Sequence, residues 1–291
     1  MQPQSIISEA VRILVTAKDS VQATVFKPAG DPRGVLVIHP ATATPQRFYR
    51  AFAELATRSG LLAVTYDYRG TGLSGSPREL RGIRMRDWIQ QDIPAVARWA
   101  AESYPDLPHY AVGHSIGGHG LILDYGTEAL SAAAIVSSHV AASRTIAPWQ
   151  ERTRVTAILN VLGPVLSRAM GYMPGQKLGL GEDIPAAALL EWSRWIRKPN
   201  YFFDDPSMQA RTRAARTRIP ILAVGASDDL WATPRQMDQL TGHLVSAPVQ
   251  RRTCTPDELG VPAIGHHGLM RRGVGEAAWP DMLDWLENRK R

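Results

Sequence analysis

Cysteine is nearly absent from the sequence, since Cys254 is the only one among 291 residues. A single thiol excludes an intramolecular disulfide and any zinc site built from cysteines. The amino-terminal residues Met1–Ala10 lack the basic segment and apolar run of a signal peptide. One thiol also fits a reducing compartment. We therefore expect a cytoplasmic protein.

Other patterns are missing as well. No run of about 18 apolar residues occurs, so the sequence predicts no membrane-spanning helix. The eight histidines show no H-E-x-x-H or other metal-binding spacing, and we expect no metal. The glycine-rich loop 67–75 has neither the Gly-Lys-Ser/Thr ending of a P-loop nor the spacing of a dinucleotide site. We expect no cofactor, and no motif indicates a nucleic-acid partner.

The composition that remains is that of an ordinary globular protein. Hydrophobic residues make up 44% and charged residues 21%, which argues against disorder. At 291 residues the chain can form one large domain, or a domain with a sizeable insertion, and bury a substantial core.

Apolar runs of strand length alternate with helical periodicity through most of the chain. This alternation is typical of a largely parallel sheet flanked by helices. Two runs near the amino terminus, separated by a polar turn, predict an antiparallel hairpin. The eight expected strands are 11–15, 21–26, 35–38, 61–66, 109–112, 132–136, 221–224 and 249–253. The helices expected around them are 46–59, 87–104, 116–125, 234–243 and 275–289.

The alternation stops between residues 140 and 218, where helix-like pieces are interrupted by prolines and glycines. We therefore predict an α/β core domain formed by residues 1–139 and 219–291, interrupted by a mainly helical insertion, 140–218. Two prolines fall inside helical patterns. Pro94 predicts a kink or a helix start near Asp92, and Pro164 predicts a break in the insertion.

Charge is concentrated in the insertion. It holds twelve Lys and Arg residues and six Asp and Glu residues, so its excess of +6 equals the net charge of the whole chain. A solvated outer face explains this excess. The alternative is that the insertion attracts anionic substrates or an acidic partner.

The stretch Gly113-His114-Ser115-Ile116-Gly117 lies between an expected strand and an expected helix. A G-x-S-x-G turn in that setting lifts the serine hydroxyl out of the sheet and points the helix amino terminus at any negative charge beside it. Glycines are needed on both sides because a side chain there would collide with the neighbouring strand or helix. Ser115 is therefore the candidate nucleophile.

A serine needs a base to accept its proton and an acid to orient that base. In sites of this kind the acid and then the histidine follow the serine along the chain. The strand 221–224 runs into Asp228 and Asp229, at the sheet edge where such sites form. The loop before the last helix supplies His266 and His267. Either aspartate can be the acid, and either histidine the base.

These motifs resemble those of the α/β-hydrolase-fold serine hydrolases, and more narrowly the bacterial α/β-hydrolases related to the serine aminopeptidase-like lipases and esterases. The resemblance covers nearly the whole chain outside the insertion. It rests on His39-Pro40-Ala41, on 67–74, on 113–118, on Gly225-Ala226-Ser227-Asp228 and on Gly265-His266-His267-Gly268.

The resemblance implies a role for five residues. Ser115 is the nucleophile, His266 the base and Asp228 the acid, with His266 preferred to His267 because it completes the Gly-His motif. Backbone N–H groups of Ile116 and Ala41 are expected to form the oxyanion hole. The common His-Gly is His39-Pro40 here; proline has no N–H, but the expected donor is the next residue.

The resemblance implies hydrolysis of a small or medium carboxylic ester, thioester or amide through an acyl-enzyme. Two alternatives stay open. One is a scaffold that binds a small molecule or protein partner without turnover, and the other is an acyltransferase or haloperoxidase-like enzyme with the same triad. The sequence determines neither the substrate and its acyl chain length nor the oligomeric state.

Overall fold

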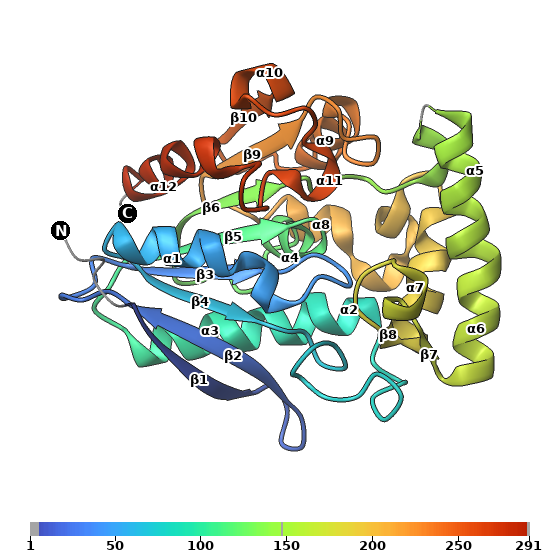
Figure 1. The fold of residues 1–291 in the computed structure, drawn as a ribbon, viewed down its shortest axis with the longest axis horizontal. Coiled ribbons are helices and arrows are strands. Elements are labelled where there is room, and N and C mark those ends of the chain that lie inside the picture. The colour runs from blue at the N-terminus through green and yellow to red at the C-terminus, as the bar shows by residue number, and fades with distance from the viewer. Residues whose placement is uncertain (1–5, 147, 290–291) are drawn as a thin grey trace.

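The computed structural model describes residues 6–146 and 148–289. In that part of the chain, eight strands form one sheet in the order β1-β2-β4-β3-β5-β6-β9-β10 (Figure 1). The strand pairs β1–β2 and β2–β4 are antiparallel and the remaining pairs are parallel. The strands are β1 (Ile7–Leu14), β2 (Ser20–Lys27), β3 (Val35–His39), β4 (Leu62–Tyr66), β5 (His109–His114), β6 (Leu130–Val136), β9 (Ile221–Ala226) and β10 (Val249–Cys254). The predicted mostly parallel eight-stranded sheet is confirmed.

Helices cover both faces of this sheet. The bounds of the helices outside the insertion are α1 (Arg50–Arg58), α2 (Met85–Asp87), α3 (Ile93–Ser103), α4 (Ile116–Ile122), α9 (Pro234–Thr241), α10 (Pro256–Leu259), α11 (Gly265–Gly268) and α12 (Trp279–Glu287). Short 3₁₀ turns precede α1 at Gln46–Tyr49 and α12 at Glu276–Ala278. The helices predicted at 46–59, 234–243 and 275–289 are thus present with ends shifted by a few residues.

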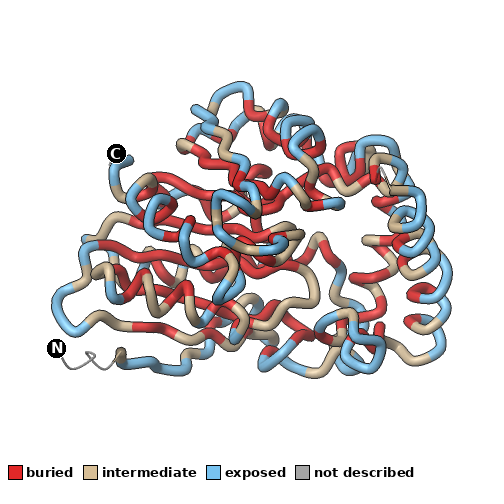
Figure 2. Tube along the Cα trace, turned by 45° about the horizontal axis from the view of Figure 1, so that its top comes forward, coloured by how far each residue is buried: buried red, intermediate tan, exposed pale blue. Residues whose placement is uncertain are grey.

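The strand β3 shows why its sequence is apolar throughout. Val35 and Val37 pack into the cluster that contains α3 and α4, whereas Leu36 and Ile38 pack into the cluster that contains α1 and α12. Alternate side chains of a strand point to opposite faces, so a strand covered on both faces needs no polar position. The edge strand β1 is mostly exposed, and Figure 2 shows the buried residues concentrated in the central strands.

The insertion lies between β6 and β9, beyond one end of the sheet, with α5 and α6 at its outer edge (Figure 1). Its elements are α5 (Trp149–Ala157), α6 (Gly163–Met170), β7 (Tyr172–Met173), β8 (Ile184–Pro185), α7 (Ala186–Ile196) and α8 (Ala210–Ala214), with 3₁₀ turns at Ser143–Thr145, Gln176–Leu178, Tyr201–Asp204 and Pro206–Met208. The small β7–β8 pair was not expected. The division into a core domain and an inserted domain at residues 139/140 and 218/219 stays a prediction.

The insertion is joined to α2 by buried charges. Arg86 contacts Glu191 at 2.5 Å and Asp205 at 2.7 Å, and all three side chains are largely buried. Among the described residues, no helix is both long and apolar enough to cross a membrane.

Both prolines that interrupt helical patterns follow a π-helical turn. Such turns occupy Trp88–Asp92, ahead of Pro94, and Ile158–Leu162, ahead of Pro164. Proline has no N–H and its ring crowds the preceding turn, and a wider turn relieves both problems without ending the helix. The alternative of a helix start near Asp92 does not agree with the structure, because the helical segment continues from α2 through the π-helical turn into α3.

Candidate active site

Ser115 occupies a strained turn between β5 and α4, with φ 52° and ψ −110°. A Cβ on Gly113 would lie 2.5 Å from the carbonyl carbon of Gly117, and a Cβ on Gly117 would overlap the carbonyl oxygen of His39. The glycines on both sides of the serine are therefore required sterically, as predicted. A non-glycine residue at positive φ is costly, and such strain is characteristic of functional sites.

The hydroxyl of Ser115 contacts His266, and His266 contacts the carboxylate of Asp229. The Ser115 Oγ–His266 Nε2 distance is 3.2 Å, and His266 Nδ1 lies 2.9 Å from Oδ2 of Asp229. Three segments that are far apart in the sequence thus form one chain of hydrogen bonds suited to proton transfer. The structure brings the predicted Ser115 and His266 together.

The choice of Asp228 as the partner of His266 is wrong. Its two carboxylate oxygens accept hydrogen bonds from the N–H groups of Ile264, at 2.8 Å, and Gly265, at 3.0 Å. Asp228 therefore fixes the loop that carries His266 and does not contact the imidazole. The tight turn after β9, closed by Asp229 N–H donating to Ala226 O, sends the two consecutive side chains in different directions.

Asp229 is held as an anion aimed at His266. Only 1% of its surface is exposed, and its Oδ1 accepts hydrogen bonds from Trp231 N–H at 2.8 Å and Ala232 N–H at 2.9 Å. Burial alone would raise the pKa of Asp229, but the hydrogen bond and charge of His266 outweigh it and bring this pKa well below its usual range. The carboxylate is thus ready to orient and stabilise an imidazolium.

His267, the rival of His266, packs beside the triad without joining it. Its ring lies edge-on to the rings of His114, at 5.1 Å, and Phe48, at 5.9 Å. Burial lowers the pKa of His267 to about 4, so the ring is neutral near pH 7. The preference for His266 agrees with this geometry.

A buried network connects the loop after β3 to the backbone of His266. Nε2–H of His114 donates to the His266 carbonyl at 3.0 Å, so Nδ1 of this neutral ring must accept. The Tyr49 hydroxyl donates to that Nδ1 at 2.9 Å, and it accepts the N–H of Ala41 at 2.8 Å. Tyr49 is thus a functional candidate that sequence inspection missed, because no motif links position 49 to position 114.

This network changes the expected oxyanion hole. The N–H of Ala41 points to Tyr49, so the prediction that it is available to an oxyanion does not agree with the geometry. Within the described residues, the N–H groups of Ile116 and Thr42 have no hydrogen-bond partner. Both residues line the same cavity as Ser115. Ile116 and Thr42 are therefore the two candidate donors that this geometry leaves open.

Replacing Tyr49 with phenylalanine should lower the free energy of unfolding by about 1–3 kcal/mol, because the Ala41 N–H and His114 Nδ1 would lose their shared partner. Urea unfolding followed by circular dichroism measures this change. Phe48→Leu is a neighbouring control that leaves the network intact. Equal stability of Tyr49→Phe and the wild type would contradict the network.

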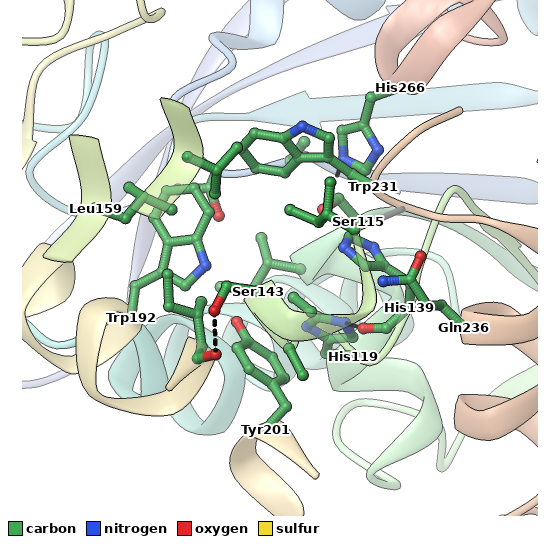
Figure 3. Close-up of a pocket in the computed structure, with 18 of the residues that line it drawn as sticks. Ser115, His119, His139, Ser143, Leu159, Trp192, Tyr201, Trp231, Gln236 and His266 are labelled. Atoms are coloured by element: carbon green, nitrogen blue, oxygen red, sulfur yellow. Dashed lines mark hydrogen bonds between the residues drawn. The ribbon is translucent and has the colours of Figure 1, made fainter. Parts of the chain in front are cut away.

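Two connected cavities open at the serine. The inner one has a volume of about 130 Å³, and residues at the triad and on the insertion line it (Figure 3). The outer one, of about 520 Å³, shares Thr42, Trp192, Trp231 and His266 with it. The lining of the outer cavity is mainly apolar, with charged groups at Arg154, Glu182 and Arg271. Among the described residues, no three His, Cys, Asp or Glu side chains cluster closely enough to hold a metal ion.

Buried neutral histidines should make the protein sensitive to acid. Burial lowers the pKa of His39 and His139 to about 3 and that of His119 and His267 to about 4. Between these values and the ordinary pKa of 6.5, the unfolded chain binds protons that the folded chain does not. Each such histidine then costs roughly 1.4 kcal/mol of stability per pH unit as the pH falls.

The melting temperature should therefore fall steeply between about pH 6.5 and about pH 4 and stay nearly flat above about pH 7.5. Differential scanning fluorimetry across this range measures it. A melting temperature that is constant down to about pH 5 would show that these rings are protonated as easily in the folded chain as in the unfolded one.

Comparison with known families agrees with this geometry. Residues 30–184, just over half of the chain, match the model of the family described as "Serine aminopeptidase, S33". The chain belongs to this family. The resemblance to α/β-hydrolase-fold serine hydrolases is thereby confirmed. The matched region contains Ser115 and the loop after β3, whereas Asp229 and His266 lie beyond it.

One curated relative and several solved structures are similar to this family member. The monoacylglycerol lipase of Mycolicibacterium smegmatis is 36% identical over 104 residues, which make up 35% of this chain and 35% of that protein. The match thus spans about a third of the length of that relative.

The solved structures support the fold. A soluble variant of the monoglyceride lipase of Saccharomyces cerevisiae superposes with a TM-score of 0.68 at 12% identity, covering 100% of this chain and 98% of that one. The monoacylglycerol lipase of Paleococcus ferrophilus gives a TM-score of 0.57 at 15% identity, covering 93% of this chain and 99% of that one. At such low identity these likenesses show the α/β-hydrolase fold alone.

Proposed function

We propose that the protein hydrolyses carboxylic esters through an acyl-enzyme, with Ser115 as nucleophile, His266 as base and Asp229 as the orienting acid. The observation that carries this proposal is the continuous contact from Ser115 Oγ through His266 to Asp229, over 3.2 Å and 2.9 Å. A buried carboxylate on Nδ1 leaves Nε2 free to take the serine proton.

In the first step, Oγ of Ser115 attacks the ester carbonyl carbon while its proton passes to Nε2 of His266. The imidazolium is stabilised by Asp229 and then gives its proton to the departing alcohol oxygen, which breaks the ester bond. Water attacks the acyl-enzyme next and gives its proton to His266. The imidazolium then returns this proton to Oγ of Ser115 as the acyl–oxygen bond breaks and the carboxylic acid leaves.

The negative charge on the carbonyl oxygen is received by backbone N–H groups. Ile116 offers its N–H at the amino terminus of α4, and Thr42 offers a second one from the loop after β3. Donors fixed by the backbone need no reorganisation during the reaction, which is why such holes contribute strongly to catalysis.

The substrate class is an ester with an apolar acyl chain. The outer cavity provides apolar walls from Phe48, Ile158, Leu189 and Trp192, and it is about four times as large as the inner cavity. Lipases of monoacylglycerol among the similar proteins support an ester of this kind. We further propose that the insertion, residues 140–218, acts as a cap, because it supplies most of this wall.

The test is hydrolysis of p-nitrophenyl esters of increasing acyl length, together with labelling by a fluorophosphonate probe. Mass spectrometry of the labelled protein should place the adduct on Ser115. Tight binding of esters with neither turnover nor labelling would favour the non-catalytic scaffold instead.

A further inference from the structure

The inner cavity has a polar end that the proposed catalytic steps do not use. His119 and His139 lie together beside Ser115, opposite Leu159 and Trp192 (Figure 3). Both histidines are almost fully buried, with 2% and 3% of their surfaces exposed. Neither contacts the hydroxyl of Ser115 through a hydrogen bond in the described part of the chain.

The hydrogen bonds of His139 fix where its proton lies. His139 stands directly after β6, and its Nδ1 lies 3.1 Å from the carbonyl oxygen of Ser137. A carbonyl can only accept, so Nδ1 carries the hydrogen and Nε2 carries a lone pair. No described protein group donates to this Nε2. The ring lies edge-on to His266, 5.3 Å away between centroids, which places it next to the reacting ester.

His119 also has one ring nitrogen that donates to a backbone carbonyl and one that has no donor. Its Nε2–H donates to the carbonyl of His139 at 2.9 Å, so its Nδ1 also carries a lone pair. This Nδ1 is buried and has no hydrogen-bond partner among the described residues. A buried acceptor without a donor is destabilising, and a ligand hydroxyl or a water would relieve that cost.

Two other polar side chains of the cavity already have hydrogen-bond partners. The Ser143 hydroxyl donates to the carbonyl of Ile196, and the amide of Gln236 contacts both Thr145 and Thr233. Burial lowers the pKa of His139 to about 3 and that of His119 to about 4, so both rings stay neutral near pH 7 and their unpartnered nitrogens stay unprotonated. The free nitrogens therefore present lone pairs only, which repel carbonyl oxygens and attract O–H groups.

We propose that Nε2 of His139, supported by His119, accepts a hydrogen bond from a hydroxyl on the alcohol portion of the substrate, so that the enzyme selects esters of polyols over esters of simple alcohols. This inference rests on the proposed ester hydrolysis. The two cavities fit the two ends of such a substrate, because His119 and His139 form a polar end of the small inner cavity and the larger outer cavity has room for the acyl chain.

The test compares two esters that differ only in hydroxyl groups, octanoyl glycerol and propyl octanoate. The wild type should hydrolyse the glycerol ester with a kcat/KM at least about tenfold higher, the size expected for one or two neutral hydrogen bonds. In His139→Phe this ratio should fall to about one, and in His139→Gln, whose amide oxygen can accept, part of the preference should return. His243→Phe, which removes a histidine stacked on Phe203 outside the cavity, should keep the wild-type ratio.

A second measurement uses only the wild-type protein and so does not depend on the folding of a variant. Octylglycerol ether should protect Ser115 of the wild type from fluorophosphonate labelling at about a tenth of the concentration that octyl propyl ether requires. Equal protection by the two ethers, or an equal kcat/KM for the two esters, would overturn the role of His139 while leaving ester hydrolysis intact. Absence of labelling and of hydrolysis of both esters would refute the proposed function and this inference together.

Discussion

Replacing Ser115 with alanine should lower kcat for p-nitrophenyl esters by roughly a millionfold, the loss expected when the nucleophile of a complete triad is removed. The reason is that the acyl-enzyme can no longer form, while the oxyanion hole and cavity survive. Fluorophosphonate labelling should disappear with the turnover. Stopped assays at high enzyme concentration, with intact-mass measurement of the probe adduct, quantify both effects.

The variant should remain folded, because the hydrogen bond lost on replacement of the Ser115 hydroxyl is the 3.2 Å contact with His266. Its melting temperature therefore separates loss of catalysis from loss of structure. Ser227→Ala is a matched control, since Ser227 is exposed in the turn after β9 and lies outside the triad. Undiminished labelling of Ser115→Ala would assign the nucleophile to another residue.

Asp229→Asn should lower kcat by about 10⁴-fold, because an amide at this position holds His266 in the wrong tautomer and no longer stabilises its charge. The effect should be much smaller for Asp228→Asn, about tenfold or less, since that carboxylate accepts only two backbone N–H groups and its amide oxygen can keep one of them. Steady-state kinetics of the purified pair measures the contrast.

The two aspartates are adjacent and equal in charge, so each variant serves as the control of the other. Melting temperatures should show that Asp228→Asn loosens the loop before His266, whereas Asp229→Asn acts mainly on kcat. If Asp228→Asn proved the more damaging to kcat at unchanged stability, the acid of the triad would be Asp228 and the assignment of Asp229 would be refuted.

Much of the fold follows from local patterns. Continuous apolar runs such as Val35–His39 identify strands covered on both faces, because such strands have no solvent side on which a polar residue is favoured. Pro94 marks the place where the helical segment 85–103 departs from ordinary α-helical hydrogen bonding, since proline has no N–H to donate. Gly113 and Gly117 identify the serine turn, because a Cβ atom at either position would collide with neighbouring backbone atoms.

The sequence by itself therefore determined the α/β architecture, and it located the strained turn at Ser115 and the segment that carries His266, because each depends on residues close together in the chain. Only the tertiary structure showed that Asp229 and not Asp228 contacts His266, that the N–H of Ala41 is engaged by Tyr49, and that His119 and His139 line the cavity at Ser115. In each of these choices neighbouring residues have similar chemistry and nearly the same position. What separates them is the direction of a side chain or an N–H group, and that direction is fixed by partners on other segments, such as Ile264 and His266 for the two aspartates and Tyr49 for Ala41.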